Sequence, residues 1–325
     1  MSNVVVLGVI ALVLAFGVAI QIGAQQAVYR RTESLARIEA NSQSLVRAMM
    51  SGQPWQLGQG ENELTSAERS ELFAEVGAGL VGTELERLRT MAETYDLTTL
   101  IDALDAKRWW HRLQAVSLAA ALAIDDRRRP QLLDDVHPSV RAAAVAWSGR
   151  VGLATTAGRI TDLLDDPDGT VRAKAFAVLS EAPPDTVSED LIRILVTPRN
   201  RQMLLAALHL AASNQHPALA KQARMWSTDD DPEIRAAAIE AIATEGSQEL
   251  VGLLADGDHT VRRAAVRGAG LSRKSELSGP VGCCLYDPCW EVRNAAVATL
   301  KQMAAPGALV LRVFSRAQMM DRSAD

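Results

Sequence analysis

Residues 166–175 read DPDGTVRAKA, and the same pattern returns as DVHPSVRAAA at residues 135–144 and as DPCWEVRNAA at residues 287–296. In each copy an aspartate stands five residues before a valine or isoleucine, an arginine follows it, and an alanine comes three residues after the arginine. Five copies carry the aspartate and the arginine: Asp135, Asp166, Asp229, Asp256 and Asp287, with Arg141, Arg172, Arg235, Arg262 and Arg293. Degenerate copies surround Arg112 and Met203. About seven copies at a spacing of about 30 residues define an internal repeat.

Each repeat predicts a short helix, a turn that contains the aspartate, and a second helix that begins near the arginine. An alanine column runs through all copies: Ala115, Ala144, Ala175, Ala206, Ala238, Ala265 and Ala296. A small residue at a fixed repeat position indicates that two helices approach closely there. One helical pair cannot bury its apolar face alone, whereas stacked pairs can. We therefore expect an all-α protein, an α-solenoid of about seven short helical pairs.

The Asp-x4-Val-Arg-x2-Ala signature resembles HEAT repeats, in particular the short bacterial type that also occurs in phycobilisome lyases. The resemblance covers residues 97–320 and implies the fold, but says little about function. Each aspartate is expected to accept backbone N–H groups at the start of its second helix, and each arginine to reach carboxylates or carbonyls of the adjacent repeat. The two columns are therefore expected to be a structural ladder, because a catalytic pair would occur once.

The first residues contain an apolar run. Residues 4–22 read VVVLGVIALVLAFGVAIQI and hold no charged side chain. At about 1.5 Å per residue, 19 residues span about 30 Å, the thickness of a bilayer core. A cleaved signal peptide fits less well, because no basic residue precedes the run. Arg30, Arg31 and Arg37 follow it, so the positive-inside bias predicts a single-pass protein of the cell membrane with its N-terminus outside and its C-terminal domain in the cytoplasm.

The segment after this run is expected to be a juxtamembrane helix. Its apolar residues recur at coiled-coil spacing, which predicts either a weakly dimerising stalk or an amphipathic helix on the membrane or on a partner. Trp55 lies in a Gly/Gln/Pro-rich linker, and Thr65-x-x-Glu68 and Thr83-x-x-Glu86 are typical of capping boxes. The predicted organisation is an anchor at 1–24, a juxtamembrane helix at 25–50, a linker at 51–64, a helical cap region at 65–96, the repeats at 97–320 and a tail at 321–325.

Residues that break the repeat are candidates for partner binding: Trp109, Trp110, Arg127, Arg128, Arg129, His259 and Trp290. The Trp109–Arg112 stretch also resembles the start of membrane-anchored bacterial HEAT proteins that accompany membrane glycosyltransferases. The alternatives are an N-terminal structural cap for the tryptophan pair, a solvated loop for the arginines, and packing on the neighbouring turn for Trp290.

The sequence offers little sign of catalysis. Cys283, Cys284 and Cys289 have poor spacing for zinc, and buried small apolar residues are the favoured interpretation. No phosphate loop, dinucleotide motif or nucleophile elbow is present, so no enzyme activity, cofactor or metal is predicted.

The leading functional hypothesis is a membrane-anchored HEAT-repeat scaffold or adaptor for a membrane-associated protein partner. The resemblance implies an accessory subunit of a membrane glycosyltransferase or of an envelope-assembly system. The alternatives are an enzyme similar to the chromophore lyases and a HEAT-type nucleic-acid-binding protein. The net charge of −5 argues against nucleic acid as a partner.

Overall fold

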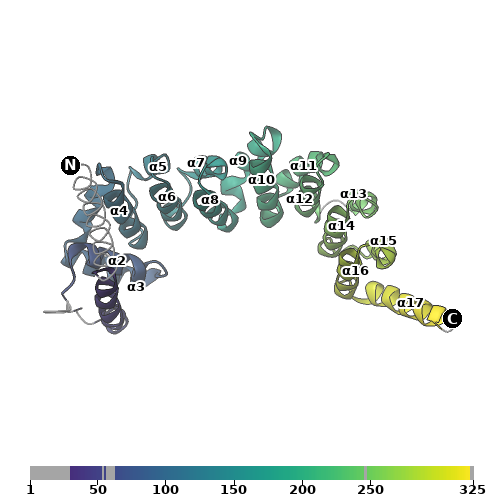
Figure 1. Cartoon of the computed structure of the whole chain (residues 1–325), viewed down its shortest axis with the longest axis horizontal. Coiled ribbons are helices and arrows are strands. Elements are labelled where there is room, and N and C mark those ends of the chain that lie inside the picture. Colours follow the sequence, from purple (N-terminus) through teal and green to yellow (C-terminus); the bar gives the residue numbers. More distant parts are fainter. Residues whose placement is uncertain (1–29, 53–54, 56–62, 245–246, 323–325) are drawn as a thin grey trace, which may run out of the picture. The chain divides into compact units, whose positions relative to one another are not determined.

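The computed structural model describes residues 30–52, 55, 63–244 and 247–322, and every regular element in these ranges is a helix (Figure 1). The predicted all-α class is therefore confirmed. The chain divides into two compact units, the first up to Leu132 (unit 1) and the second from Leu133 onward (unit 2). The first predicted repeat thus falls in unit 1, together with the region expected to cap the repeats.

Unit 1 is built from helices of different lengths. After a helix over residues 30–51, its elements are α2 (Ser66–Gly77), α3 (Gly82–Thr94), the 3-10 helix η2 (Leu97–Asp105), α4 (Trp109–Ala121) and α5 (Arg129–Leu132). α4 packs on both α2 and η2. This contact joins the first repeat to the cap region.

The helix over residues 30–51 belongs to the core of unit 1. Ile38, Leu45 and Met49, which have coiled-coil spacing, are buried within the chain. Arg37 pairs with Glu68 of α2, and Arg87 of α3 donates a hydrogen bond of 2.7 Å to the carbonyl of Met49. These three apolar side chains therefore stabilise unit 1.

Trp55 is also part of this core. Its Nε1–H donates to Ser44 Oγ at 2.9 Å, and its ring makes edge-to-face contacts with Phe73 and Tyr95. The Tyr95 hydroxyl donates to the carbonyl of Trp55. The indole is therefore docked on its own unit.

One of the two predicted capping boxes is present. Thr65 and Glu68 cap α2 reciprocally, as predicted. The prediction at Thr83 was wrong, because α3 already begins at Gly82 and the hydroxyl of Thr83 donates to the Glu84 carboxylate. Gly82 has φ 62°, a conformation that favours glycine, and the helix starts here, two residues before Glu84, where a cap at Thr83 would have started it.

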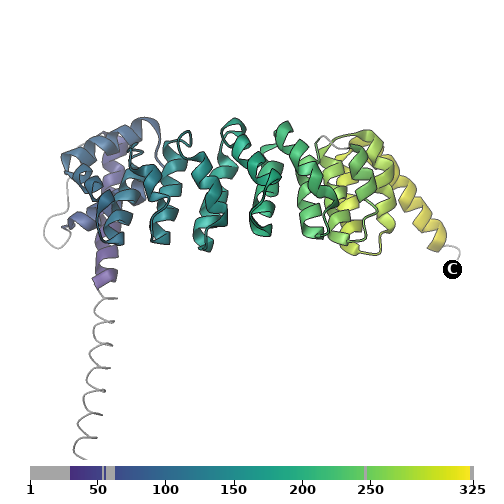
Figure 2. The same ribbon diagram turned by 90° about the horizontal axis from the view of Figure 1, so that it is seen from above.

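Unit 2 repeats one arrangement of helices along the chain. Its elements are α6 (Pro138–Val151), α7 (Ala157–Asp162), η3 (Leu163–Asp165), α8 (Gly169–Glu181), α9 (Pro184–Val196), α10 (Arg201–Asn214), α11 (Pro217–Ala223), η4 (Arg224–Thr228), α12 (Pro232–Ile242), α13 (Ser247–Leu253), α14 (His259–Leu271), η5 (Ser275–Leu277), α15 (Ser278–Cys283), η6 (Cys284–Tyr286), α16 (Trp290–Gln302) and α17 (Ala304–Arg322). The long helices α6, α8, α10, α12, α14 and α16 pack on one another in chain order (Figure 2). The fold of this unit is therefore repeat-like.

The alanine column lies between these long helices. Ala144, Ala175, Ala238, Ala265 and Ala296 are completely buried.

The degenerate copy differs from the prediction by one residue. The N-cap of α10 is Asn200, so Met203 takes the buried valine position. Ala207, rather than Ala206, is then the fully buried alanine.

The predicted membrane localisation needs correction. Among the residues that the structure describes, no helix combines the length and the apolar character that crossing a bilayer requires. α17 has 19 residues but includes Arg312 and Arg316, and the helix over residues 30–51 carries charged side chains along its length. The run at residues 4–22 lies outside the described residues. The single-pass topology with a cytoplasmic C-terminal domain is therefore not supported.

Candidate functional site

The turns before α6, α8, α12 and α14 share one hydrogen-bonding scheme. The repeat aspartate accepts the backbone N–H of the residue two positions later, as Asp256 does from Asp258 at 2.8 Å. That second residue is the helix N-cap, and the side chain of Asp258 in turn accepts the N–H of Thr260 at 2.7 Å. The turns are therefore held by two consecutive side-chain bonds.

The repeat arginines connect neighbouring repeats. Arg262 donates from Nε and Nη2 to both carboxylate oxygens of Asp287, at 2.7 and 2.9 Å, and from Nη1 to the carbonyl of Asp256 at 2.8 Å. The hydrogen bonds from Arg262 hold the pKa of Asp287 below its usual range. The same bidentate contact joins Arg141 to Asp166 and Arg235 to Asp256. We call these pairs the ladder.

The ladder is interrupted next to α10. Arg172 donates to the carbonyls of Asp166 and Pro167 of its own turn, and Arg293 does the same with Asp287 and Pro288 in the last turn. Asp135 accepts the N–H of His137, and Asp229 accepts that of Asp231, as elsewhere in the repeat. All ten predicted ladder residues thus take part in turn or inter-repeat hydrogen bonds.

The turns leave a row of exposed and half-buried positions, which we call the turn ridge: residues 136–139, 167–170, 230–233, 257–260 and 288–291. Trp290, at the tip of the last of these turns, is 64% exposed. It is the first residue of α16, and the corresponding first residues are Pro138, Gly169, Pro232 and His259. The partner-binding candidates His259 and Trp290 therefore occupy the same position in two successive repeats.

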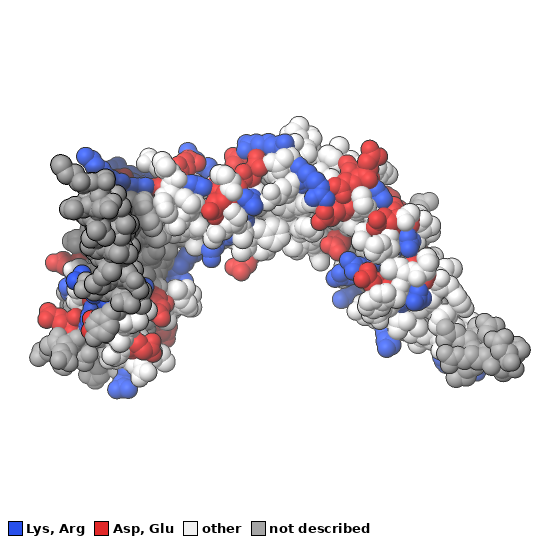
Figure 3. Space-filling view, in the orientation of Figure 1, with Lys and Arg blue, Asp and Glu red and all other residues white. Residues whose placement is uncertain are grey.

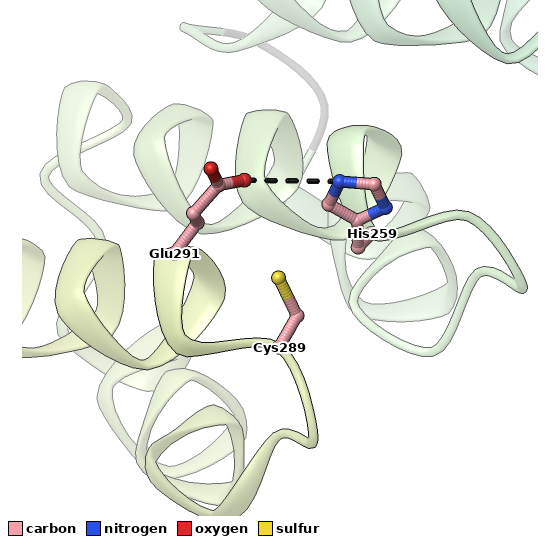
Figure 4. Close-up of side chains that lie close together, drawn as sticks. All are labelled: His259, Cys289 and Glu291. Atoms are coloured by element: carbon pink, nitrogen blue, oxygen red, sulfur yellow. Dashed lines mark ion pairs between the residues drawn. The ribbon is translucent and has the colours of Figure 1, made fainter.

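Three chemically different side chains lie close together at the turns before α14 and α16 (Figure 4), and two of them flank Trp290 in the sequence. His259 begins α14, Cys289 is the N-cap of α16, and Glu291 is the second residue of α16. His259 Nε2 lies 3.7 Å from Glu291 Oε2, and the nearest donor atoms of all three residues lie within 4.8 Å of one another. Among the residues that the structure describes, these three have the side-chain types and the spacing that suit a metal ion.

Cys289 departs from the repeat at the N-cap. In α6, α8, α10, α12 and α14 the N-cap side chain accepts a backbone N–H from its own helix. Cys289 makes no such bond. Its thiol is thus not engaged in capping α16.

The other two cysteines lie apart from this group. Cys284 is buried, and its burial raises the pKa of the thiol to about 11. Cys283 is exposed, contrary to the prediction that it is buried. Cys289 is half-buried, and all three cysteines are free thiols.

The predicted tryptophan pair lies in unit 1, at the start of α4. Trp109 is half-buried and Trp110 is 45% exposed, with their rings edge to face at 5.9 Å. The Arg108 guanidinium carbon lies 5.1 Å from the centre of the Trp110 ring. One indole therefore packs inward while the other, under a cation, faces outward.

The predicted arginine run is largely compensated by acidic groups. Arg128 pairs with Asp126 and Asp105, and the buried Arg129 pairs with Asp125. The hydrogen bond from Arg128 lowers the pKa of Asp126. Arg127 is the exposed member of the run, so the run does not form a basic patch of three free cations.

No protein-family model and no curated protein matches the sequence. The chain is similar to two engineered proteins whose crystal structures come from the Northeast Structural Genomics Consortium. The first is 15% identical, with a TM-score of 0.37 over 80% of this chain and 78% of that one. The second is 15% identical, with a TM-score of 0.26 over 75% of this chain and 93% of that one.

Proposed function

We propose that unit 2 is an α-solenoid of the HEAT-like type and acts as a scaffold that binds a protein partner along the turn ridge. The order in which the long helices pack, and the ladder between their turns, support the solenoid. The described residues of unit 2 show no arrangement of side chains that indicates catalysis. Binding is the function that this arrangement supports best.

The exposure of Trp290 carries this proposal. Water contact over most of an indole is unfavourable, and tryptophan is enriched among the residues that contribute most to protein interfaces. The Trp290 backbone is fixed, because Asp287 accepts the N–H of Cys289 and is itself held by Arg262. A rigid turn loses little conformational entropy on binding, which favours affinity.

The charge of the ridge defines the chemistry of the partner. Its turns carry Asp168, Asp230, Asp231, Glu233, Asp258 and Glu291, and no lysine or arginine. Arg201 of α10 pairs with Asp231 and Glu233, so Asp168, Asp230 and Asp258 supply most of the charge that is left for a partner. A partner segment that combines an apolar anchor for Trp290 with basic side chains would complement this surface.

The alternative of nucleic-acid binding has less support. Figure 3 shows acidic and basic side chains interspersed on the face in view, as expected where arginines pair with aspartates across repeats. Binding of nucleic acid depends on accumulated positive charge. The net charge of −5 adds to this argument.

A comparison of two variants of the full chain tests the proposal. Trp290→Ala removes the ridge anchor. Leu271→Ser is the control, because Leu271 is similarly exposed, at 57%. It lies at the C-terminal end of α14, in a groove of about 730 Å³, whereas the ridge residues 257–260 lie at the N-terminal end of that helix. Each variant and the unaltered protein would be crosslinked in extracts of the source cells and compared by quantitative mass spectrometry.

The proposal expects a defined partner that Trp290→Ala loses and Leu271→Ser retains. Loss with Leu271→Ser alone would move the binding surface to the groove. Identical sets of crosslinked proteins for all three chains would contradict binding on the ridge.

A further inference from the structure

We propose that His259, Cys289 and Glu291 form a binding site for a zinc-class divalent metal ion between the turns before α14 and α16. This inference is independent of the proposed scaffold function. The ligands would be His259 Nε2, Cys289 Sγ and a Glu291 carboxylate oxygen, and a water molecule would complete four-coordination.

The side-chain types fit such an ion. Zinc binds imidazole nitrogen, thiolate sulfur and carboxylate oxygen at about 2.0–2.3 Å, in a tetrahedral arrangement. The donor atoms of such a tetrahedron lie about 3.3–3.6 Å apart. The distance of 3.7 Å between His259 Nε2 and Glu291 Oε2 is close to this range. The donor atoms of the three residues all lie within 4.8 Å of one another, so they need to move by little more than 1 Å to reach tetrahedral spacing.

The site lies on fixed backbone. His259 follows the N-cap Asp258, whose side chain bonds the start of α14. Asp287, two residues before Cys289, accepts the Cys289 N–H at 2.8 Å and is held by Arg262 of the preceding repeat. The ladder thus fixes the relative position of the two turns that supply the ligands, so small side-chain rotations suffice to close the site.

Cys289 distinguishes a metal site from a simple ion pair. A histidine and a glutamate across two turns need no metal to attract one another. Cysteine at the N-cap of α16, however, replaces a residue whose equivalents in α6, α8, α10, α12 and α14 accept backbone hydrogen bonds. The positive end of the α16 dipole favours the negative charge that a thiolate ligand carries.

One neighbouring group competes for the site. Arg263 Nη1 lies 3.8 Å from Glu291 Oε2, and its side chain is 43% exposed. An exposed pair at this distance is weak and its arginine can rotate into solvent. Metal binding would therefore displace Arg263 from Glu291.

Cobalt and zinc titrations of the purified full chain test the proposal. Co²⁺ reports on its own ligands, because a bound thiolate gives a charge-transfer band in the near ultraviolet and four-coordination gives strong visible bands. Zinc is then added to displace cobalt, and the stoichiometry is measured by calorimetry. The variants are His259→Gln, Cys289→Ser and Glu291→Gln, with Cys283→Ser as the matched control, since Cys283 is an exposed thiol outside the group.

The proposal predicts one ion per chain with a thiolate–cobalt band. Loss of an outer-shell contact weakens metal sites 10–100-fold, so each ligand variant should weaken zinc binding by more than about tenfold. Cys283→Ser should leave binding unchanged. Cys289→Ser keeps a residue that is well suited to an N-cap, so its circular dichroism should remain that of the unaltered chain.

Several results would overturn the site. These are the absence of binding by the unaltered chain, unchanged affinity in Cys289→Ser, or a cobalt band that depends on Cys283. A cobalt spectrum typical of six oxygen and nitrogen ligands would also exclude it.

Discussion

Replacing Arg262 by methionine should destabilise unit 2 by about 3–5 kcal/mol, because it leaves the buried Asp287 carboxylate without its partner. The Asp287 side chain is 7% exposed, and Arg262 supplies both inter-repeat hydrogen bonds to it. The variant also removes the donor to the carbonyl of Asp256. Methionine retains most of the apolar stem, so the cost arises from the lost hydrogen bonds and the unpaired charge.

Arg193→Met is the matched control. Arg193 lies 3.4 Å from both Asp162 and Asp190, and its side chain is 47% exposed. Exposed pairs of this kind contribute less than about 1 kcal/mol. Urea unfolding of the full chains, followed by circular dichroism, gives the free-energy difference, and hydrogen exchange assigns it to α14 and α16.

The pH dependence provides a second check on the same pair. The folded-state pKa of Asp287 is depressed, chiefly by the hydrogen bonds from Arg262. The pair therefore contributes fully above the unfolded aspartate pKa of about 3.9, and its contribution is lost as the pH falls through the lower folded value. The difference between Arg262→Met and the unaltered chain should hold at pH 7 and shrink in acid. Equal costs for Arg262→Met and Arg193→Met at pH 7 would refute the ladder as a stabilising feature.

Two further substitutions test the remaining local interactions. Burial alone would raise the pKa of Glu68, but hydrogen bonds from Thr65, Arg37 and Ser34 outweigh it and hold the pKa at about 2. Glu68 therefore contributes roughly 3 kcal/mol to the free energy of unfolding above pH 4.5, and this contribution disappears as the pH falls toward 2. In urea unfolding, Glu68→Gln should abolish this part of the dependence of stability on acid pH. An unchanged profile would show that Glu68 does not act this way. Cys289→Ser should stabilise the metal-free protein by about 1 kcal/mol, because serine caps α16. For a unit of the size of unit 2, residues 133–325, this amount raises the melting temperature by about 2–4 °C. A lower melting temperature without metal would mean that the thiol makes a contact that the serine does not replace.

The repeat was readable from sequence because its columns are fixed by backbone geometry. Val140, Val171 and Val261 are completely buried at the starts of their helices, as their spacing from the aspartates indicates. The degenerate copy was misplaced by one residue, because without the aspartate and the arginine only the cap at Asn200 defines its register.

The limits of the sequence are clearest in unit 1. Heptad spacing at Ile38, Leu45 and Met49 is the same for a dimer seam and for a helix packed inside its own chain, and the structure shows burial within the chain. The arginine run at residues 127–129 is preceded by its partners Asp125 and Asp126, but the sequence gives no sign of Asp105, which lies 23 residues before Arg128.

Zinc was set aside because ligands were sought around the three cysteines together, and Glu291 was not considered with Cys289 and His259. The repeat period itself holds the signal, since residues about one repeat apart, such as His259 and Trp290, lie in adjacent turns. The residues that flank Trp290 therefore face His259. In repeat proteins, candidate metal ligands should therefore be sought among residues that lie about one repeat length apart in the sequence.

Photocrosslinking from the ridge tests the scaffold account most directly. A benzophenone side chain would be placed at position 257 of the ridge in one full-length chain, which keeps Trp290, and at position 271 in another, and both would be irradiated in cells. The account predicts one dominant adduct from position 257, mapped to a basic segment of a single partner protein, and none of that adduct from position 271. The same diverse adducts from both positions would contradict it.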